Sequence, residues 1–241
     1  MTLQGKRAVI TGASRGIGLA IATAFADAGA KVVVSSRNQS VCDEVAKSIN
    51  GVGIAADVTD EGAVDALFDA VEKRGGCDIF VANAGLAASG FASDVSRADL
   101  QAMLDLHYLG ALHGAQRAAR QMKARGGGAV LFVSSIWGLR GQPSALAYGA
   151  AKAALAHAVK VLAIEWARDD IRVNGLAPGF VDTAMTADLD EAVKAKLVSR
   201  VPMRRMAEAR EMAGPALFLC SDAASYVTGH VLVADGGETA R

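Results

Sequence analysis

Short apolar segments alternate along the chain with longer segments of helical periodicity. The short segments have no polar alternation, which is typical of strands that lie between two layers of helices. They fall at residues 8–10, 31–35, 53–56, 79–81, 130–133, 171–176 and 230–233. Helical periodicity covers residues 17–28, 40–49, 60–73, 96–125, 147–168 and 191–219, the last with a break near Pro202.

This alternation predicts an α/β fold: a doubly wound, Rossmann-type parallel sheet of about seven strands with helices on both faces. No internal repeat, low-complexity tract or linker divides the chain, so residues 1–241 are expected to form a single domain. In such a sheet, ligands bind beyond the carboxyl ends of the strands, where the strand order reverses. Candidate chemistry is therefore sought in the residues that follow each strand.

Composition and charge exclude several classes of protein. Hydrophobic residues make up 52% of the chain and charged residues 21%, which is enough apolar material for a full core. Lys and Arg (25) balance Asp and Glu (25), so nothing predicts binding to nucleic acid or to an anionic membrane. The first residues lack an apolar signal segment. The longest uncharged run, residues 79–93, is too short and too polar to span a bilayer.

The three cysteines, Cys42, Cys77 and Cys220, lie far apart and form no CxxC pair. We interpret them as buried free thiols of a protein in a reducing compartment and expect a cytoplasmic location. No metal site is expected.

A glycine-rich turn follows the first strand. Its G-x-x-x-G-x-G spacing differs from the commoner G-x-G-x-x-G, but its glycines equally let the backbone approach a phosphate at a helix N-terminus. A purely structural turn is the alternative. The position at the first strand–helix junction favours a dinucleotide site at Gly12, Ser14, Arg15, Gly16, Ile17 and Gly18.

A second candidate group follows the fifth strand. Ser135 ends that strand, and Tyr148 and Lys152 stand four residues apart on one face of the next helix. A free tyrosine titrates near pH ~10, and a neighbouring ammonium is expected to lower its pKa. The three side chains suit proton transfer that accompanies hydride transfer. Taken alone, a Tyr-x-x-x-Lys spacing also arises by chance.

In these motifs and their order, the chain resembles the short-chain dehydrogenase/reductase family, in its short single-domain branch, over residues 3–237. The resemblance implies an oxidoreductase similar to carbonyl reductases and to 3-oxoacyl-[acyl-carrier-protein] reductases. It rests on the glycine turn, Asp57-Val58, Asn83-Ala84-Gly85, Ser135, Tyr148 with Lys152, Pro178-Gly179 and Asp235-Gly236-Gly237.

The resemblance also implies roles for the reacting side chains. Tyr148 would be the general acid in reduction and the base in oxidation, Lys152 would bind the nicotinamide ribose, and Ser135 would orient the carbonyl. His107 stands where the family usually carries an asparagine that supports a water relay to the lysine. Its imidazole could take over the relay in its neutral form, or it could be a packing residue.

The remaining implied residues, together with Tyr148 and Lys152, would hold the cofactor. Asp57 and Val58 would meet the adenine, Asn83 would tie the central strands together, and Thr183 would meet the carboxamide. The further implied contacts are Ala84 and Gly85 at the adenosine ribose, and Pro178, Gly179 and Val181 around the nicotinamide.

The end of the second strand predicts the cofactor. An NAD-binding site usually places a carboxylate there, whereas this chain has Ser36 followed by Arg37. Arg37 and Arg15 could hold a 2′-phosphate through charge-assisted hydrogen bonds. We therefore expect NADP(H) rather than NAD(H), and reduction of a carbonyl. The alternative is that Arg37 is an ordinary solvated residue.

An apolar substrate pocket is expected beside Tyr148. Trp137 could flank a bulky or cyclic ketone, or it could belong to the core. A small carbonyl or alcohol is the expected substrate, and the expected pocket consists of Leu86, Phe91, Trp137, Leu139 and Met185.

Two other functions stay open. A 3-oxoacyl thioester reductase would need a basic surface for an acidic carrier protein; Lys123 and Arg125 supply charge, but Asp169 and Asp170 oppose it. A non-catalytic dinucleotide-binding regulator is the second alternative.

Many small residues on the two longest helices also predict a homotetramer or homodimer.

Overall fold

The computed structural model describes residues 1–86, 90–187 and 190–240. Within them, seven parallel strands form one sheet in the order β3-β2-β1-β4-β5-β6-β9, which confirms the predicted doubly wound fold. The order reverses between β1 and β4. The strands are β1 (Arg7–Thr11), β2 (Lys31–Ser35), β3 (Val52–Gly53), β4 (Ile79–Ala82), β5 (Gly128–Val133), β6 (Ile171–Pro178) and β9 (Val231–Ala234).

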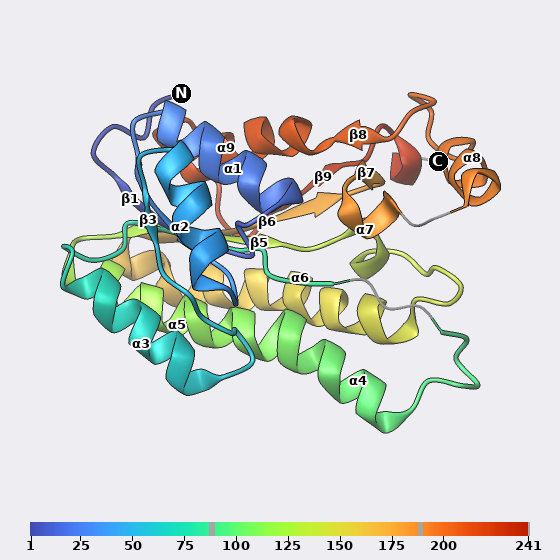
Figure 1. Ribbon diagram of the computed structural model, residues 1–241, viewed down its shortest axis with the longest axis horizontal. Helices are drawn as coiled ribbons and strands as arrows, with labels where there is room; N and C mark the ends of the chain where they lie inside the picture. The colour runs from blue at the N-terminus through green and yellow to red at the C-terminus, as the bar shows by residue number, and fades with distance from the viewer. Residues whose placement is uncertain (87–89, 188–189, 241) are drawn as a thin grey trace.

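Helices cover both faces of the sheet (Figure 1). One layer contains α1 (Gly16–Asp27), α2 (Gln39–Ser48) and α9 (Ala213–Cys220). The other contains α3 (Glu61–Glu72), α4 (Arg97–Leu104), α5 (Gly110–Ala124) and α6 (Leu146–Trp166). Beyond the carboxyl ends of β5 and β6 lie α7 (Ala184–Ala187), α8 (Glu191–Val198) and the small pair β7 (Val181–Asp182) and β8 (Ala207–Glu208).

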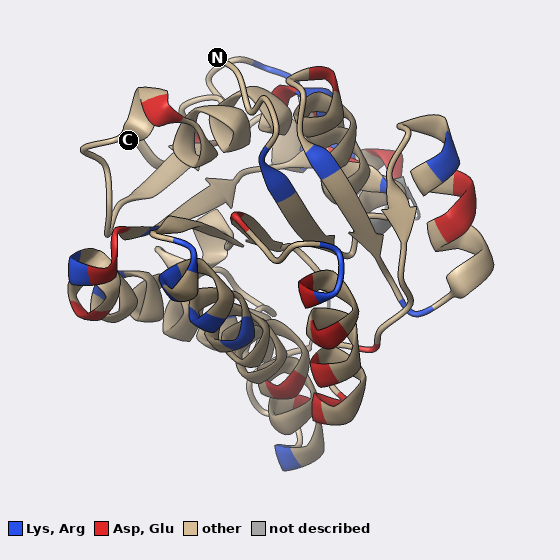
Figure 2. Cartoon of the chain, turned by 90° about the vertical axis from the view of Figure 1, so that its left-hand side faces the viewer, with Lys and Arg blue, Asp and Glu red and all other residues tan. Residues whose placement is uncertain are grey.

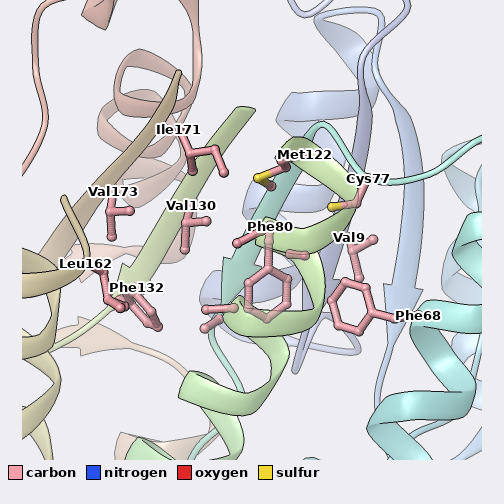
Figure 3. Close-up of a cluster of buried hydrophobic side chains, with 14 of the residues drawn as sticks. Val9, Phe68, Cys77, Phe80, Met122, Val130, Phe132, Leu162, Ile171 and Val173 are labelled. Atoms are coloured by element: carbon pink, nitrogen blue, oxygen red, sulfur yellow. The ribbon is translucent and has the colours of Figure 1, made fainter. Parts of the chain in front are cut away.

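Each layer seals its own hydrophobic cluster against the sheet. Side chains alternate along β1, so Val9 enters one cluster while Ala8 and Ile10 enter the other. In the cluster of Figure 3, Phe68 meets Phe80 edge to face at 5.5 Å between ring centroids. Burial on both faces explains why the strands read as continuous apolar segments.

The long helix expected over residues 96–125 is interrupted. A π-helical turn, Asp105–Leu109, separates α4 from α5. Gly110 follows the turn, and a Cβ there would lie 2.2 Å from the Val58 carbonyl oxygen. The prediction did not resolve this turn, because it rests on the overall extent of helical periodicity and not on the hydrogen-bond register within it.

Other boundaries also differ from the prediction. The third strand spans residues 52–53 rather than 53–56, and the segment 191–219 contains α8, β8 and α9 instead of one broken helix. The strand β7 was not predicted. Its Val181 pairs with Ala207 of β8, so each two-residue strand exists only through a partner distant in sequence.

Helix α6 and the turn after it, residues 146–169, are long and apolar enough to cross a membrane by length and composition. Half of the most apolar window is buried inside the fold. Leu155, Val159 and Leu162 pack in the cluster below the sheet, so we interpret α6 as a core helix. All three cysteines are buried and unpaired within the described residues, as predicted.

Candidate active site

The glycine turn lies where the strand order reverses. Thr11 ends β1 beside Ala82 of β4, so the residues that follow both strands meet there. The Asn83 side-chain amide donates to the carbonyl oxygens of Thr11 (3.2 Å) and Gly12 (3.0 Å), the strand-tying contact that was expected. A Cβ on Gly18 would lie 2.3 Å from the Gly12 oxygen. Only glycine at position 18 lets the helix approach the strand this closely.

The residues of this turn fit a dinucleotide phosphate. Arg15 precedes α1 without a side-chain capping bond, and the first helical turn holds no acidic residue. Its free backbone N–H groups and the positive end of the helix dipole therefore remain available for an anion. At Gly16, with a φ of 56°, a Cβ would meet only the Thr183 side chain, at 3.4 Å. The missing side chain leaves the space that a phosphate requires.

Ser36 and Arg37 directly follow β2, as predicted, and Arg37 is exposed. Asp57 lies close to Arg37. Hydrogen bonds from the Thr59 amide and hydroxyl hold the pKa of the Asp57 carboxyl below its usual value, and the Arg37 charge adds to this. The residues expected at the adenosine end thus lie together.

The predicted reacting group is assembled at the carboxyl end of β5. The Lys152 Nζ lies 5.7 Å from the centre of the Tyr148 ring and donates to the Val133 carbonyl at 2.7 Å. Ser135 precedes a 3₁₀ turn (Ile136–Gly138), and its hydroxyl accepts from the Trp137 amide at 3.2 Å. The neighbouring Ser134 hydroxyl donates to the Lys152 carbonyl at 3.1 Å, a contact that ties β5 to α6.

Burial controls the ionisation of this group. It raises the pKa of Tyr148 above its ordinary value, and a hydrogen bond with Ser135 opposes the rise. The expected lowering by the Lys152 ammonium is therefore wrong in this structure: desolvation of the phenol prevails. Burial also lowers the pKa of Lys152 to about 7, so this side chain gives up its proton near neutral pH.

His107 stands in the π-helical turn and is only 2% exposed. Its Nε2 lies 2.8 Å from the Leu86 carbonyl oxygen. Because a carbonyl only accepts, Nε2 carries the proton and Nδ1 is an acceptor, which has no partner among the described residues. Desolvation, with the charge of Lys152, lowers the pKa of His107 to about 3, in agreement with the neutral form predicted for it.

A small cavity adjoins His107. It has a volume of about 10 Å³ and is lined by Thr11, Ala84, His107 and Lys152, among others. A cavity of ~10–15 Å³ is about the space that one water molecule needs. The His107 ring also meets Tyr148 edge to face, at 5.1 Å between centroids.

Trp137 packs against the candidate catalytic tyrosine rather than within the main core. Its ring lies 5.9 Å from that of Tyr148 and 6.1 Å from that of Phe180. Phe180, which follows Pro178-Gly179 directly, was not among the five pocket residues expected from the sequence. Leu86, Phe91 and Leu139 are exposed, Phe91 to 67%. The Met185 side chain lies outside the described residues.

The segment expected around the nicotinamide adjoins the phosphate turn. Gly179 donates from its amide to the Ala234 carbonyl at 3.0 Å, and a Cβ on Gly179 would lie 2.7 Å from the Asp235 Cβ. Val181 is buried in β7. A Cβ on Gly16 would lie 3.4 Å from the Thr183 side chain, so the phosphate turn and the nicotinamide segment of the expected cofactor site adjoin.

The family model described as Enoyl-(Acyl carrier protein) reductase matches residues 12–239, from the glycine turn past β9. The chain belongs to the short-chain dehydrogenase/reductase family. It is similar, at 40% identity over 240 residues, to cis-4-hydroxycyclohexanecarboxylate dehydrogenase of Sinomonas cyclohexanicum. That match covers 97% of this chain and 96% of the relative.

Solved structures of the family share the fold throughout. A gluconate 5-dehydrogenase from Burkholderia cenocepacia J2315, in complex with NADP and tartrate, has a TM-score of 0.96 at 35% identity and covers 100% of this chain and 97% of its own. A 7α-hydroxysteroid dehydrogenase complexed with NADH has a TM-score of 0.92 at 37% identity, with coverage of 98% and 95%. These relatives are oxidoreductases of alcohol or ketone groups, and their complexes contain either nicotinamide cofactor.

Proposed function

We propose that this protein is an NADP(H)-dependent oxidoreductase that reduces a small-molecule ketone, or oxidises the corresponding secondary alcohol, with Tyr148 as acid and base. The observation that carries the proposal is the adjacency of Ser135, Tyr148 and Lys152 next to a glycine turn that fits a phosphate.

The chemistry divides between the cofactor and the chain. Bound NADPH supplies the hydride. The Ser135 hydroxyl orients the carbonyl oxygen of the substrate, and the Tyr148 phenol donates the proton to that oxygen. A raised pKa keeps the phenol protonated near neutral pH, which favours its role as the acid in reduction. Lys152 holds the nicotinamide ribose.

His107 completes the site as the neutral member of a water relay. A water in the small cavity would donate to the His107 Nδ1 and accept from the Lys152 ammonium. The protonated imidazole would lose this acceptor, and its low pKa avoids that loss. The relay of this chain therefore uses a ring nitrogen in place of an amide oxygen.

The preference for NADP(H) rests on the end of β2. No carboxylate stands at Ser36 or Arg37 to accept a ribose 2′-hydroxyl or to repel a 2′-phosphate. Arg37 is exposed at this end of the strand, and Arg15 is exposed at the start of α1. The NADP complex of the related gluconate 5-dehydrogenase supports the proposal.

The apolar surroundings of Tyr148 favour a bulky or cyclic ketone. The Trp137 ring meets Tyr148 edge to face and the Phe180 ring meets Trp137 in the same way, and Leu86, Phe91 and Leu139 expose further apolar surface. The relative of Sinomonas cyclohexanicum is named for a cyclohexane ring that bears a hydroxyl group.

Reduction of a carrier-bound 3-oxoacyl thioester has less support. The two basic side chains considered for carrier docking are already paired: Lys123 with Asp169 at 2.9 Å and Arg125 with Asp78 at 3.0 Å. Acidic and basic positions of neighbouring helices also face one another, as in the pairs that Arg117 makes with Asp65 and Asp69 (Figure 2). An acidic carrier that docked on Lys123 and Arg125 would have to displace these existing partners.

The test is a panel of cyclic and linear ketones with NADPH and NADH, followed at 340 nm. We expect turnover with cyclic ketones and NADPH. Tyr148→Phe should lower turnover by about 10²–10⁴-fold while NADPH still binds, because the phenol supplies only the transferred proton. Turnover above a tenth of the wild-type rate would assign the acid role to another group. Binding of NADPH without turnover of any ketone would favour a regulatory protein.

A further inference from the structure

The turn that follows β9 contacts three other segments of the chain, two of which belong to the candidate active site. Its Gly236 carbonyl accepts from the Met203 amide at 3.2 Å, and Ala234 accepts from Gly179 at 3.0 Å. Its third connection is an ion pair, in which the Arg140 Nη2 donates to the Glu238 Oε1. Arg140 and Glu238 are 98 positions apart in the chain.

The turn itself is held rigid by one carboxylate. The Asp235 Oδ1 accepts from the Gly237 amide at 2.9 Å, and its Oδ2 accepts from the amide and the hydroxyl of Thr239, both at 2.7 Å. Glu238 therefore projects from a fixed backbone. Its side chain is 1% exposed, whereas that of Arg140 is 35% exposed.

Arg140 belongs to the segment that carries the carbonyl-orienting serine. Its amide donates to the Ile136 carbonyl at 3.0 Å, and the Gly138 amide donates to the Ser135 carbonyl at 3.0 Å. These bonds make residues 135–140 one compact turn. A movement of Arg140 is therefore transmitted to Ser135 and to Trp137, whose ring lies against Tyr148.

We propose that Glu238 is a positioning residue: through Arg140 it holds the turn 135–140 against the segment after β9, and so sets the placement of the carbonyl substrate. The proposal rests on the proposed function. A buried carboxylate is costly unless it is paired, so Glu238 stabilises the position of Arg140 in which the two side chains form their ion pair. Substrate geometry is sensitive to such placement, because a displacement of about 1 Å costs up to about 10²-fold in rate.

The experiment compares Glu238→Gln, Arg140→Gln and the double variant with the wild type. Glu238→Gln keeps the shape of the side chain and removes its charge. We expect kcat/KM for the ketone to fall by about 10- to 100-fold, mainly through KM, with the dissociation constant of NADPH unchanged within about twofold. The double variant should be no worse than either single variant, since both break the same contact.

Glu211→Gln is the matched control. It breaks another Arg–Glu pair of the same region, with Arg205 at 2.6 Å, but Arg205 and Glu211 make no bond to the turn 135–140 among the described residues. Its KM for the ketone should stay at the wild-type value. An unchanged KM in Glu238→Gln, additive effects in the double variant, or an equal change in Glu211→Gln would each overturn the proposal.

Amide hydrogen exchange gives a readout that does not depend on turnover. Residues 136–146 should exchange at least about tenfold faster in Glu238→Gln than in the wild type, and α2 should not change. Arg140→Gln should show the same increase in exchange. Arg140→Lys, which keeps the charge, should show a smaller increase than Arg140→Gln. If no ketone is turned over but this local exchange increases, the proposed activity is wrong and the positioning contact stands. Unchanged exchange at residues 136–146 overturns the positioning role itself.

Discussion

At the scale of single residues, burial decides which groups near Tyr148 carry charge. Desolvation raises the pKa of the Tyr148 phenol, lowers that of Lys152 to about 7 and lowers that of His107 to about 3. At neutral pH the phenol is protonated and the imidazole is neutral. The site is therefore poised to donate a proton, as the proposed reduction requires.

His107 should make stability depend on pH. An unfolded histidine titrates near pH ~6.5, whereas the folded His107 has a pKa of about 3. Its contribution is complete above pH ~6.5 and is lost as the pH falls toward 3, because only the unfolded chain takes up the proton; the slope is at most about 1.4 kcal/mol per pH unit. Between about pH 7 and pH 5, the wild type should lose more Tm than His107→Asn.

Two substitutions of His107 test the water relay. His107→Asn should retain substantial turnover, whereas His107→Leu should lower turnover much more than it weakens NADPH binding. His157→Asn, which alters an exposed imidazole on α6, should change neither property. Wild-type turnover in the leucine variant would show that His107 only packs.

Arg37 should determine the choice of cofactor. Arg37→Asp removes a partner of the 2′-phosphate and adds an acceptor for the ribose hydroxyl, so NADPH should weaken and NADH should improve. A lost charge-assisted contact corresponds to about 1.5–3 kcal/mol, or about 10- to 150-fold in the dissociation constant of NADPH. Arg74→Asp, at an exposed position after α3, is the control. An unchanged NADPH-to-NADH preference would contradict the NADP(H) assignment.

At the scale of elements, close backbone approach governs the glycine turn. A Cβ on Gly18 would stand 2.3 Å from the Gly12 oxygen and 2.4 Å from the Asn83 amide nitrogen, so α1 would have to move away from β1. The same contact aligns the N-terminus of α1 for a phosphate. Packing and binding therefore depend on the same residue.

Gly18→Ala should lower the free energy of unfolding by about 1–3 kcal/mol, as overpacking does, and weaken NADPH binding. Gly214→Ala in α9 is the matched control, because a Cβ there meets nothing within 4 Å. That variant should be neutral or more stable by up to about 1 kcal/mol. Equal effects of the two alanines, measured by denaturant unfolding and NADPH titration, would contradict the packing argument.

At the scale of the whole molecule, apolar side chains are left exposed on neighbouring helices. Ile164, on α6, is 80% exposed, and Leu109 and Val161 are exposed on the π-helical turn and on α6, which contact each other. Large apolar side chains exposed on adjoining elements favour a subunit interface.

Light scattering should therefore show a dimer or tetramer, and Ile164→Glu should lower the mass at micromolar concentration. Val193→Glu, at an exposed position of α8, should leave the mass unchanged. A monomeric wild type at micromolar concentration would contradict this prediction.

The sequence by itself determined the order of the main strands and helices along the chain, the positions of Gly12 and Ser135 after strands, and the spacing of Tyr148 and Lys152 on one helix face. These are properties of local periodicity and spacing, which each segment carries without its neighbours. The sequence placed Tyr148 correctly but could not predict the rise in its pKa, since that pKa depends on how deeply other segments bury the ring.

Only the tertiary structure decided the π-helical turn around His107, the pairing of Val181 with Ala207 and the contact of Arg140 with Glu238. Each joins or reshapes segments whose own sequence shows no preference for that arrangement. Their physical cause is packing between parts of the chain that are distant in sequence, where burial and charge, not local periodicity, select the contact.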